Sequence, residues 1–451
     1  MLLHLFVCAV TGKMMLMSTS RWFRFVKEAV RWLTPGLGIK RWLGILLAGT
    51  TLLGVGIGLW VLDVYRTAPE TWWLPLLAYL SLRFLARPVR VVIFGGIGLT
   101  LMGLGIWGMN RSLLAPFISS RQSVVDAVVT YRKRERGPRI VAIGGGHGLS
   151  NLLRGLKAYS HNITAVVTVA DDGGSSGRLR DSLGILPPGD IRNCLAALSN
   201  DEALLTQLFQ YRFGDNVDGL EGHSFGNLFI SALSEIMGSF EDAVAESGRV
   251  LSVHGRVLPA TLHDVRLVAD VRLPHTASSV RVRGESRIPE VNGRVQRVWL
   301  EPNDPPAYPR VVQAILAADL IVIGPGSLYT SILPNLLVPD IVQAIRASQA
   351  LKIFVCNIAN QAGETDNYRC GDYIRAVEGH TGPNLVDVVL VNDRFPAAAA
   401  EKVAWVQIDS GVQYPLYRAD LVNEARPWQH DSVKLSETLM AILNERTDVL
   451  G

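Results

Sequence analysis

Cysteine is scarce in this sequence, with only four in 451 residues. They are Cys8, Cys194, Cys356 and Cys370. No two of them are spaced as CxxC, and no Cys/His spacing typical of a zinc site is present. The scarcity predicts a reducing compartment, and the spacing excludes the common zinc-binding motifs.

The familiar catalytic motifs are also missing. The sequence contains no P-loop GxxxxGK[ST], no HExxH and no Ser–His–Asp order of a known hydrolase class. No single residue stands out as a nucleophile, which leaves open whether the protein is an enzyme. The net charge is only +4, and outside the N-terminal part lysine and arginine are mixed with acids. This mixture argues against a nucleic-acid-binding protein.

Two long hydrophobic runs lie near the N-terminus of a chain whose mean hydropathy is +0.24. Residues 43–62 read LGILLAGTTLLGVGIGLWVL and residues 91–109 read VVIFGGIGLTLMGLGIWGM, both without a charge. A helix of about 20 residues crosses the ~30 Å hydrocarbon core of a bilayer. The runs therefore predict two transmembrane helices, with a pair of buried core helices as the alternative.

The charges around these runs predict an orientation. Basic residues cluster before the first run and after the second, so both ends of the anchor are expected in the cytoplasm. The chain is thus predicted to be a multi-pass cell-membrane protein with its large domain in the cytoplasm. It would consist of a basic N-terminal segment (1–42), a two-span anchor (43–110), a basic linker (111–136) and a globular domain (137–451).

The globular domain alternates short β-branched runs with helical stretches. RIVAIGGGHGLSNLLRGLKAY predicts a strand, a glycine loop and an amphipathic helix, and NITAVVTVADDGG predicts a second strand. Strands that alternate with helices indicate an α/β, Rossmann-like fold, with a mainly parallel sheet and helices on both faces. Such sheets bind ligands beyond the carboxyl ends of their strands.

A glycine loop follows the first of these strands. Its residues are Gly144, Gly145, Gly146, His147 and Gly148. Glycines let the backbone approach a phosphate, and the helix that follows offers free N–H groups and the positive end of its dipole. The loop departs from GxGxxG, so a simple tight turn is the alternative. His147 could donate to a ligand or lie in solvent.

Two aspartates, Asp171 and Asp172, end the second strand. In doubly wound folds an acid at this place often binds a ribose hydroxyl. The second acid could accept a proton, hold a divalent metal such as Mg²⁺, or cap the turn. Both could also be turn acids without a ligand. The flexible, donor-rich turn behind them contains Gly173, Gly174, Ser175 and Ser176.

Three later loops complete the candidate binding site. Their candidate residues are Asp190, Arg192 and Asn193; His223, Ser224 and Asn227; and Gly324, Gly326 and Ser327. Arg192 could bind phosphate in a bidentate manner or form a structural pair with an acid. Ser224 is expected to cap the following helix. The GPGS turn follows another strand and is a second candidate anion site.

Seven stretches occur in a fixed order from about Arg139 to about Asn444. They are IVAIGGGHGLSNLLRGLK, TVADDGGSSGRLR, PPGDIRNCLAALS, GHSFGNLFISAL, VLPATL, IGPGSLYTSILPNLLV and CNIANQAGETDNY. Together they closely resemble the bacterial gluconeogenesis factor family, which is related to 2-phospho-L-lactate transferase. His147 is a departure, because the family more often has threonine there. The membrane segment lies outside the resemblance.

The resemblance implies a Rossmann-like domain that binds a nucleotide-type ligand, with UDP-sugars as the best candidates. It also implies control of cell-envelope precursor metabolism and cell shape during gluconeogenic growth, together with a protein partner in that metabolism. A homo-oligomer is expected. The alternative is a 2-phospho-L-lactate transferase-like enzyme that uses a nucleotide-activated phosphoester and Mg²⁺ held by Asp171 or Asp172. A scaffold with a vestigial nucleotide site is a third hypothesis.

Overall fold

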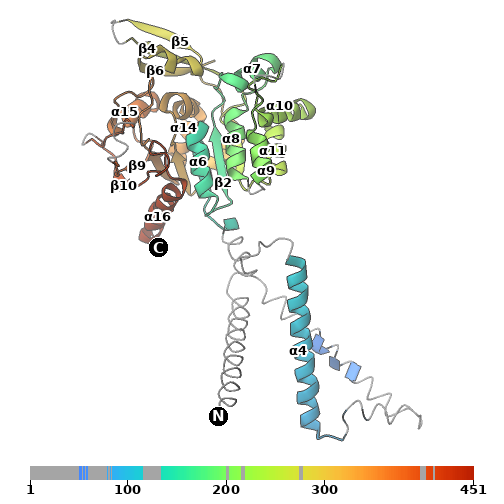
Figure 1. Ribbon diagram of the computed structural model, residues 1–451. Helices are drawn as coiled ribbons and strands as arrows, with labels where there is room; N and C mark the ends of the chain where they lie inside the picture. The colour runs from blue at the N-terminus through green and yellow to red at the C-terminus, as the bar shows by residue number, and fades with distance from the viewer. Residues whose placement is uncertain are drawn as a thin grey trace, which may run out of the picture. The chain divides into compact units, whose positions relative to one another are not determined.

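The computed structural model divides the chain into two compact units, Met1–Arg132 and Lys133–Gly451 (Figure 1). The structure describes residues 50–52, 54–55, 57–58, 79, 82, 84–114, 134–199, 203–214, 219–273, 278–396, 403–409 and 412–450.

The described part of the first unit consists mainly of one helix, α4, Arg87–Leu114. It includes the second hydrophobic run, 91–109, whereas most of the first run, 43–62, lies outside the described residues. Among the described residues no single helix is both long and apolar enough to cross a membrane. One pair of helices, Leu328–Leu336 with Pro339–Ala347, meets the length and composition criteria together but is bent by 73°. The two-span anchor stays a prediction.

A seven-stranded parallel sheet forms the centre of the second unit, in the order β10-β9-β8-β7-β1-β2-β3. Its strands are β1 Ile140–Gly144, β2 Ile163–Val167, β3 Arg256–Pro259, β7 Leu320–Ile323, β8 Leu351–Val355, β9 Val388–Asn392 and β10 Leu416–Ala419. The predicted Rossmann-like α/β fold is confirmed. The chain builds outward from β1 to β3 and then returns to β7, beside β1. The strand order therefore reverses between β1 and β7, where doubly wound sheets bind their ligands.

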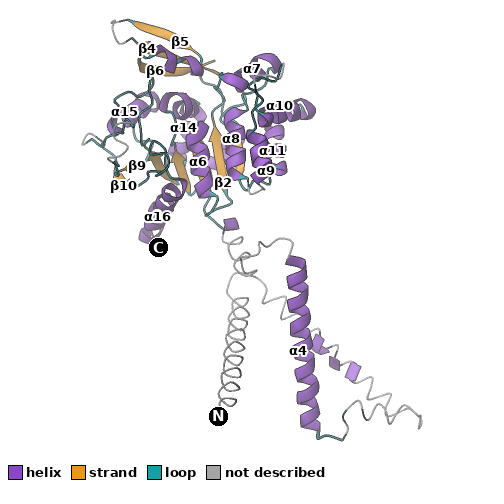
Figure 2. Cartoon of the chain, in the orientation of Figure 1, coloured by secondary structure: helices purple, strands orange, loops and turns teal. Residues whose placement is uncertain are grey.

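Helices cover the sheet on both faces, which explains why β1, β2 and β7 are buried along their whole length. Figure 2 shows helices α6 and α8 beside strand β2. The helices of this unit are α6 Gly146–Leu156, α7 Gly174–Leu183, α8 Gly189–Leu198, α9 Ala203–Gln210, α10 Phe225–Met237, α11 Phe240–Val250, α12 Pro309–Leu316, α13 Leu333–Leu336, α14 Pro339–Ala347, α15 Cys370–Thr381 and α16 Ser432–Leu450.

A second, antiparallel sheet is an element that the sequence patterns did not predict. It has the order β5-β4-β6, with β4 Arg266–Arg272, β5 Ser279–Arg283 and β6 Arg294–Glu301. Apolar side chains on one of its faces are buried, as in Leu267 and Val282. The short helix η2, Glu285–Arg287, follows β5 directly and brings Glu285 to the central site described below.

The C-terminal helix α16 packs directly on α6. At the crossing, a Cβ on Gly155 would lie 2.0 Å from the carbonyl oxygen of Ser432. Only glycine allows so close an approach of two backbones. The contact matters for the site because α6 begins at the first glycine loop and α16 begins just after another segment of the site.

We expect Gly155→Ala to lower the free energy of unfolding by about 1–3 kcal/mol or more, because the new methyl group must push α16 away. Gly379→Ala is the matched control. Gly379 lies in α15 with open space around it, so alanine there should be neutral or stabilising by up to about 1 kcal/mol. Urea unfolding followed by circular dichroism measures both. Equal stability of the two variants would contradict the close helix contact.

Candidate functional site

A polar cavity of about 440 Å³ opens where the strand order reverses. It is lined by Gly145, Gly146, His147, Gly148, Asn151, Asp171, Asp190, Glu285, Pro325, Gly326, Ser327, Ser331, Asn357, Ile358, Ala359, Asn360, Gln361, Trp428, Gln429 and His430. These residues come from the segments after the carboxyl ends of β1, β2, β7 and β8, from the first turns of α6 and α8, from η2 and from the segment before α16. Among these lining residues there is no lysine or arginine.

The first glycine loop lines the cavity with its residues Gly145–Gly148. Gly146 has a φ of +60°, which favours glycine. A Cβ on Gly145 would lie 2.6 Å from Asp190 Oδ2, and one on Gly148 would lie 2.5 Å from the Pro325 carbonyl oxygen. The N-cap residue Gly145 has no side chain to cap α6, and the Asp190 carboxyl group accepts a hydrogen bond from the Gly146 N–H. The predicted loop is thus part of the cavity, and its glycines allow close approach of neighbouring residues.

The second loop, Gly324–Ser327, lies against the first and is held by two amide side chains. Asn357 accepts a hydrogen bond from the Gly326 N–H (3.2 Å) and donates one to the Gly326 carbonyl (2.8 Å). Gln361 Nε2 donates to Ser327 Oγ at 2.7 Å. The Gly326 N–H is therefore already used, whereas the Ser327 hydroxyl keeps its own proton to donate.

Three carboxyl groups, those of Asp171, Asp190 and Glu285, form an acidic end of the cavity. Burial, reinforced by the Asp171 charge, raises the pKa of Asp190 to about 6. Burial and the Asp171 and Asp190 charges raise the pKa of Glu285 well above its usual value. Burial also raises the pKa of Asp171. The three groups repel one another when ionised, so this end of the cavity favours protonated carboxyl groups.

The two consecutive aspartates point in different directions. Asp171 lines the cavity and accepts a hydrogen bond from the Gly173 N–H at 2.8 Å. Asp172 lies outside the lining and accepts from the Ser286 N–H at 3.0 Å. The pair therefore does not converge on one ion. Within the described residues, no group of three or more His, Cys, Asp or Glu residues is placed to hold a metal.

Three other predicted site residues, Ser175, His223 and Asn227, bond to one another and do not line the cavity. Ser175 Oγ lies 3.0 Å from His223 Nδ1 and accepts from Asn227 Nδ2 at 3.0 Å. All three residues are buried. Ser224 caps α10, as predicted, by accepting from the Asn227 N–H. Ser176 Oγ accepts from the Gly189 N–H at 3.1 Å. The bonds among Ser175, His223 and Asn227 join the turn Gly173–Ser176 to the start of α10, and the Ser176 bond joins the same turn to the start of α8.

The other predicted site residues do not line the cavity. Arg192 is buried and donates to the side chain of its neighbour Asn193 at 2.9 Å. The predicted residues outside the lining are Gly144, Asp172, Gly173, Gly174, Ser175, Ser176, Arg192, Asn193, His223, Ser224, Asn227 and Gly324. The structure thus brings the first glycine loop, Asp171, Asp190, Gly326 and Ser327 together.

Sequence reasoning missed the lining residues Asn151, Glu285, Pro325 and Ser331 and two further groups. Asn357–Gln361 follow strand β8, so the rule that ligands bind beyond the carboxyl ends of strands could have found them. Trp428, Gln429 and His430 follow no strand, and no motif marks them. Only the packing of α16 on α6 places them beside Asn151, which donates to the His430 carbonyl at 2.5 Å.

Comparison with known proteins places these features in a family. The model of the family 2-phospho-L-lactate transferase CofD matches residues 140–447. The gluconeogenesis factor of Bacillus subtilis (strain 168) is 51% identical over 255 residues, covering 56% of this chain and 78% of the relative. That of Listeria monocytogenes serovar 1/2a is 43% identical over 326 residues, covering 70% and 99%.

Two further relatives extend the comparison. A protein from Nostoc sp. (strain PCC 7120) is 49% identical over 407 residues, which cover 87% of this chain and 85% of the relative. A crystal structure of a protein from Bacillus halodurans, 43% identical, superposes with a TM-score of 0.63 and covers 68% of this chain and 99% of that chain.

We expect Asp190→Asn to stabilise the protein at pH 7.5 by about 1–3 kcal/mol. Since the folded-state pKa of about 6 lies above the usual 3.8, Asp190 favours folding below pH 4 and this contribution is lost as the pH rises through 6. Asparagine avoids the buried charge. Thermal unfolding between pH 4 and 8 measures the difference, which should vanish at the acid end.

Asp319→Asn provides a control of opposite sign. Asp319 bonds Arg139, which lowers the pKa of the carboxyl group, so its variant should melt lower at pH 7.5 and approach the wild type as the pH falls. A lower melting temperature of Asp190→Asn at pH 7.5 would show instead that the Asp190 charge is stabilised in the fold.

Proposed function

This chain belongs to the 2-phospho-L-lactate transferase CofD family, among the bacterial gluconeogenesis factors, and we propose that its cavity binds a nucleotide sugar of the UDP-sugar class. Binding would regulate cell-envelope precursor metabolism and cell shape during growth on gluconeogenic carbon sources. The observation on which this rests is the meeting of two glycine loops in one polar cavity where the strand order reverses.

The centre of the cavity suits a diphosphate. Gly145, the N-cap residue of α6, has no capping side chain, and the Gly146 N–H is bonded to Asp190. The first turn offers its N–H groups beyond Gly146 and the positive end of the helix dipole. The Ser327 hydroxyl lies on the opposite loop, and the two loops touch at Gly148 and Pro325. A diphosphate between them would contact both.

The acidic end suits sugar hydroxyls, which donate to carboxylates. A diphosphate close to Asp171, Asp190 and Glu285 needs compensation for the repulsion between negative charges. Protons on the acids, favoured by the raised pKa values, supply one form of compensation. A bound Mg²⁺ that bridges Asp171 and the phosphates supplies another.

The transferase alternative rests on the family model and on these same acids, which could position Mg²⁺ on a nucleotide-activated phosphoester. The two functions differ in turnover. If the protein is a transferase, incubating it with a nucleotide-activated phospholactate, a deazaflavin alcohol and Mg²⁺ yields the phosphodiester and releases the nucleoside monophosphate. For a regulator we expect no product, together with saturable binding of a UDP-sugar in calorimetry.

Ser327 offers a test that changes one charge. We expect Ser327→Asp to weaken UDP-glucose binding at least tenfold, because a carboxylate on the second loop repels the diphosphate. The asparagine in Ser327→Asn has nearly the shape of aspartate but no charge, so this variant should lose much less affinity for UDP-glucose. Calorimetric titration of both purified, folded variants compares them. Wild-type affinity in Ser327→Asp would show that no phosphate lies at this loop.

We further propose that the chain is held in the cell membrane by two spans, with both ends in the cytoplasm, that it forms a homo-oligomer and that it acts on a protein partner of envelope precursor synthesis. A reporter enzyme that works only in the cytoplasm should be active when it is fused after Gly451. Activity of a periplasm-dependent reporter at the same position would overturn the orientation.

A further inference from the structure

We propose that Trp428 recognises the base of the nucleotide by stacking on it, and that the ligand therefore lies with its base toward the segment before α16 and its sugar toward the acidic end. This inference rests on the proposed function, and it adds the direction of the ligand and the residue on which its base stacks.

The cavity has two chemically different ends. Asp171, Asp190 and Glu285 form the acidic end. We call the other group of lining residues the base end. It consists of the segment Asn357–Gln361, which carries three amide side chains, and the segment Trp428–His430. The glycine loops contact both groups, since a Cβ on Gly145 would lie 2.6 Å from Asp190 Oδ2 and the Gly326 N–H donates to Asn357 at 3.2 Å. A diphosphate on these loops would direct one half of the ligand toward each end.

Trp428 is the aromatic residue at the base end, and 53% of its side chain surface is exposed. Large aromatic side chains usually bury most of their surface. An exposed indole beside a polar cavity offers a flat face on which a nucleobase can stack, an interaction worth about 1–3 kcal/mol per base.

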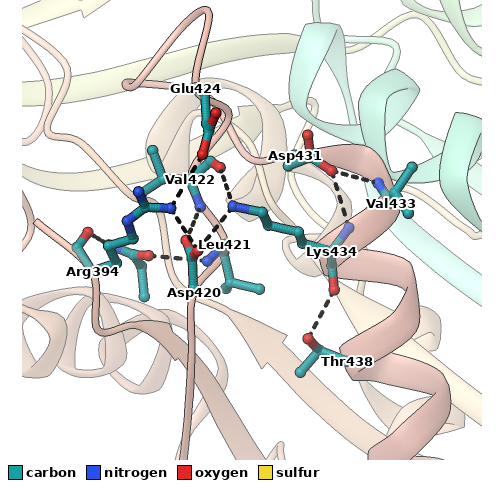
Figure 3. Close-up of polar contacts among 10 residues, drawn as sticks. Arg394, Asp420, Leu421, Val422, Glu424, Asp431, Val433, Lys434 and Thr438 are labelled. Carbon is teal, nitrogen blue, oxygen red and sulfur yellow. Dashed lines mark hydrogen bonds and ion pairs between the residues drawn. The ribbon is translucent and has the colours of Figure 1, made fainter. Parts of the chain in front are cut away.

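A network of ion pairs holds the segment that presents Trp428 (Figure 3). Asp420 accepts from both Arg394 and Lys434 at 2.9 Å. Arg394 also pairs with Glu424 at 3.5 Å, and Lys434 donates to the Val422 carbonyl at 3.0 Å. The segment is thus fixed at its start to the first turns of α16.

Bonds within the segment fix the position of Trp428 itself. The Asn423 side chain accepts from the Ala425 and Arg426 N–H groups at 3.0 Å. The Gln429 N–H donates to the Arg426 carbonyl, and the Asn423 N–H donates to the Gln429 carbonyl. Since the backbone on both sides of Trp428 is bonded, stacking on it would cost little ordering.

His430 supplies an independent sign of a ligand at this end. It is 7% exposed and lines the cavity, yet its Nε2 has no partner among the described residues. Burial lowers the pKa of His430 to about 4, and its ring bonds the Cys356 backbone, so Nε2 is a neutral acceptor at pH 7. Gln361 Oε1 is a second buried acceptor without a described partner. Uracil has the imide N–H that such acceptors need.

The experiment compares Trp428→Ala, Trp428→Phe and Trp299→Ala in the full-length protein. Trp299 lies on β6, outside the lining, and serves as the control. Calorimetry measures the binding of UDP-glucose, UDP, CDP and inorganic pyrophosphate. We expect Trp428→Ala to weaken UDP-glucose and UDP by the same factor, tenfold or more, and to change pyrophosphate less than twofold. Trp428→Phe should lose at most about threefold, and the wild type should prefer UDP to CDP.

The outcomes separate this inference from the proposed function. If the wild type binds neither UDP-glucose nor pyrophosphate, the proposed function is wrong and the inference falls with it. If the wild type binds UDP-glucose and Trp428→Ala, with an unchanged melting temperature, binds it equally well, only the stacking is overturned. Loss of affinity for UDP-glucose but not for UDP would place Trp428 at the sugar and would likewise overturn the assigned direction.

Discussion

The site depends on the contact between two loops at the point where the sheet reverses its strand order. The backbone at Gly148 lies so close to the Pro325 carbonyl that a Cβ would approach it to 2.5 Å. This contact places the N-terminus of α6 opposite Ser327 and leaves the space above both loops open. Glycine at this position is thus required by packing between β1 and β7, which lie side by side in the sheet but 180 residues apart in sequence.

The acidic end shows that the cavity is not optimised for stability. Asp190 and Glu285 are buried close to Asp171 with raised pKa values. The charges of Arg192 near Asp190 and Arg180 near Asp171, both outside the lining, offset the effect of burial only in part. Buried like charges destabilise a fold unless protons or a ligand relieve the repulsion. Polar groups retained at such a cost are typical of binding sites. Gln361 and His430 at the base end likewise each bury an acceptor atom without a partner among the described residues.

Much of the fold was predictable from local patterns. The alternation of buried β-branched runs with amphipathic helices indicated the parallel sheet, and the first glycine loop and Asp171 lie at its carboxyl edge as expected. The different directions of Asp171 and Asp172 were not predictable. Asp172 accepts a hydrogen bond from Ser286, more than a hundred residues later in the sequence. The antiparallel sheet that brings Glu285 to the cavity was also missed, since no local pattern tells whether a strand joins the main sheet or a second one.

The sequence by itself determined the α/β class, the family and the two loops that meet at β1 and β7, because short-range periodicity and glycine-rich turns encode strand–loop–helix units directly. Only the tertiary structure decided which polar residues share the cavity. It turned Ser175, His223 and Asn227 toward one another, and it brought Trp428 and His430 to the first loop through the packing of α16 on α6 at Gly155. Such choices arise from contacts between distant segments, whose geometry no local pattern specifies.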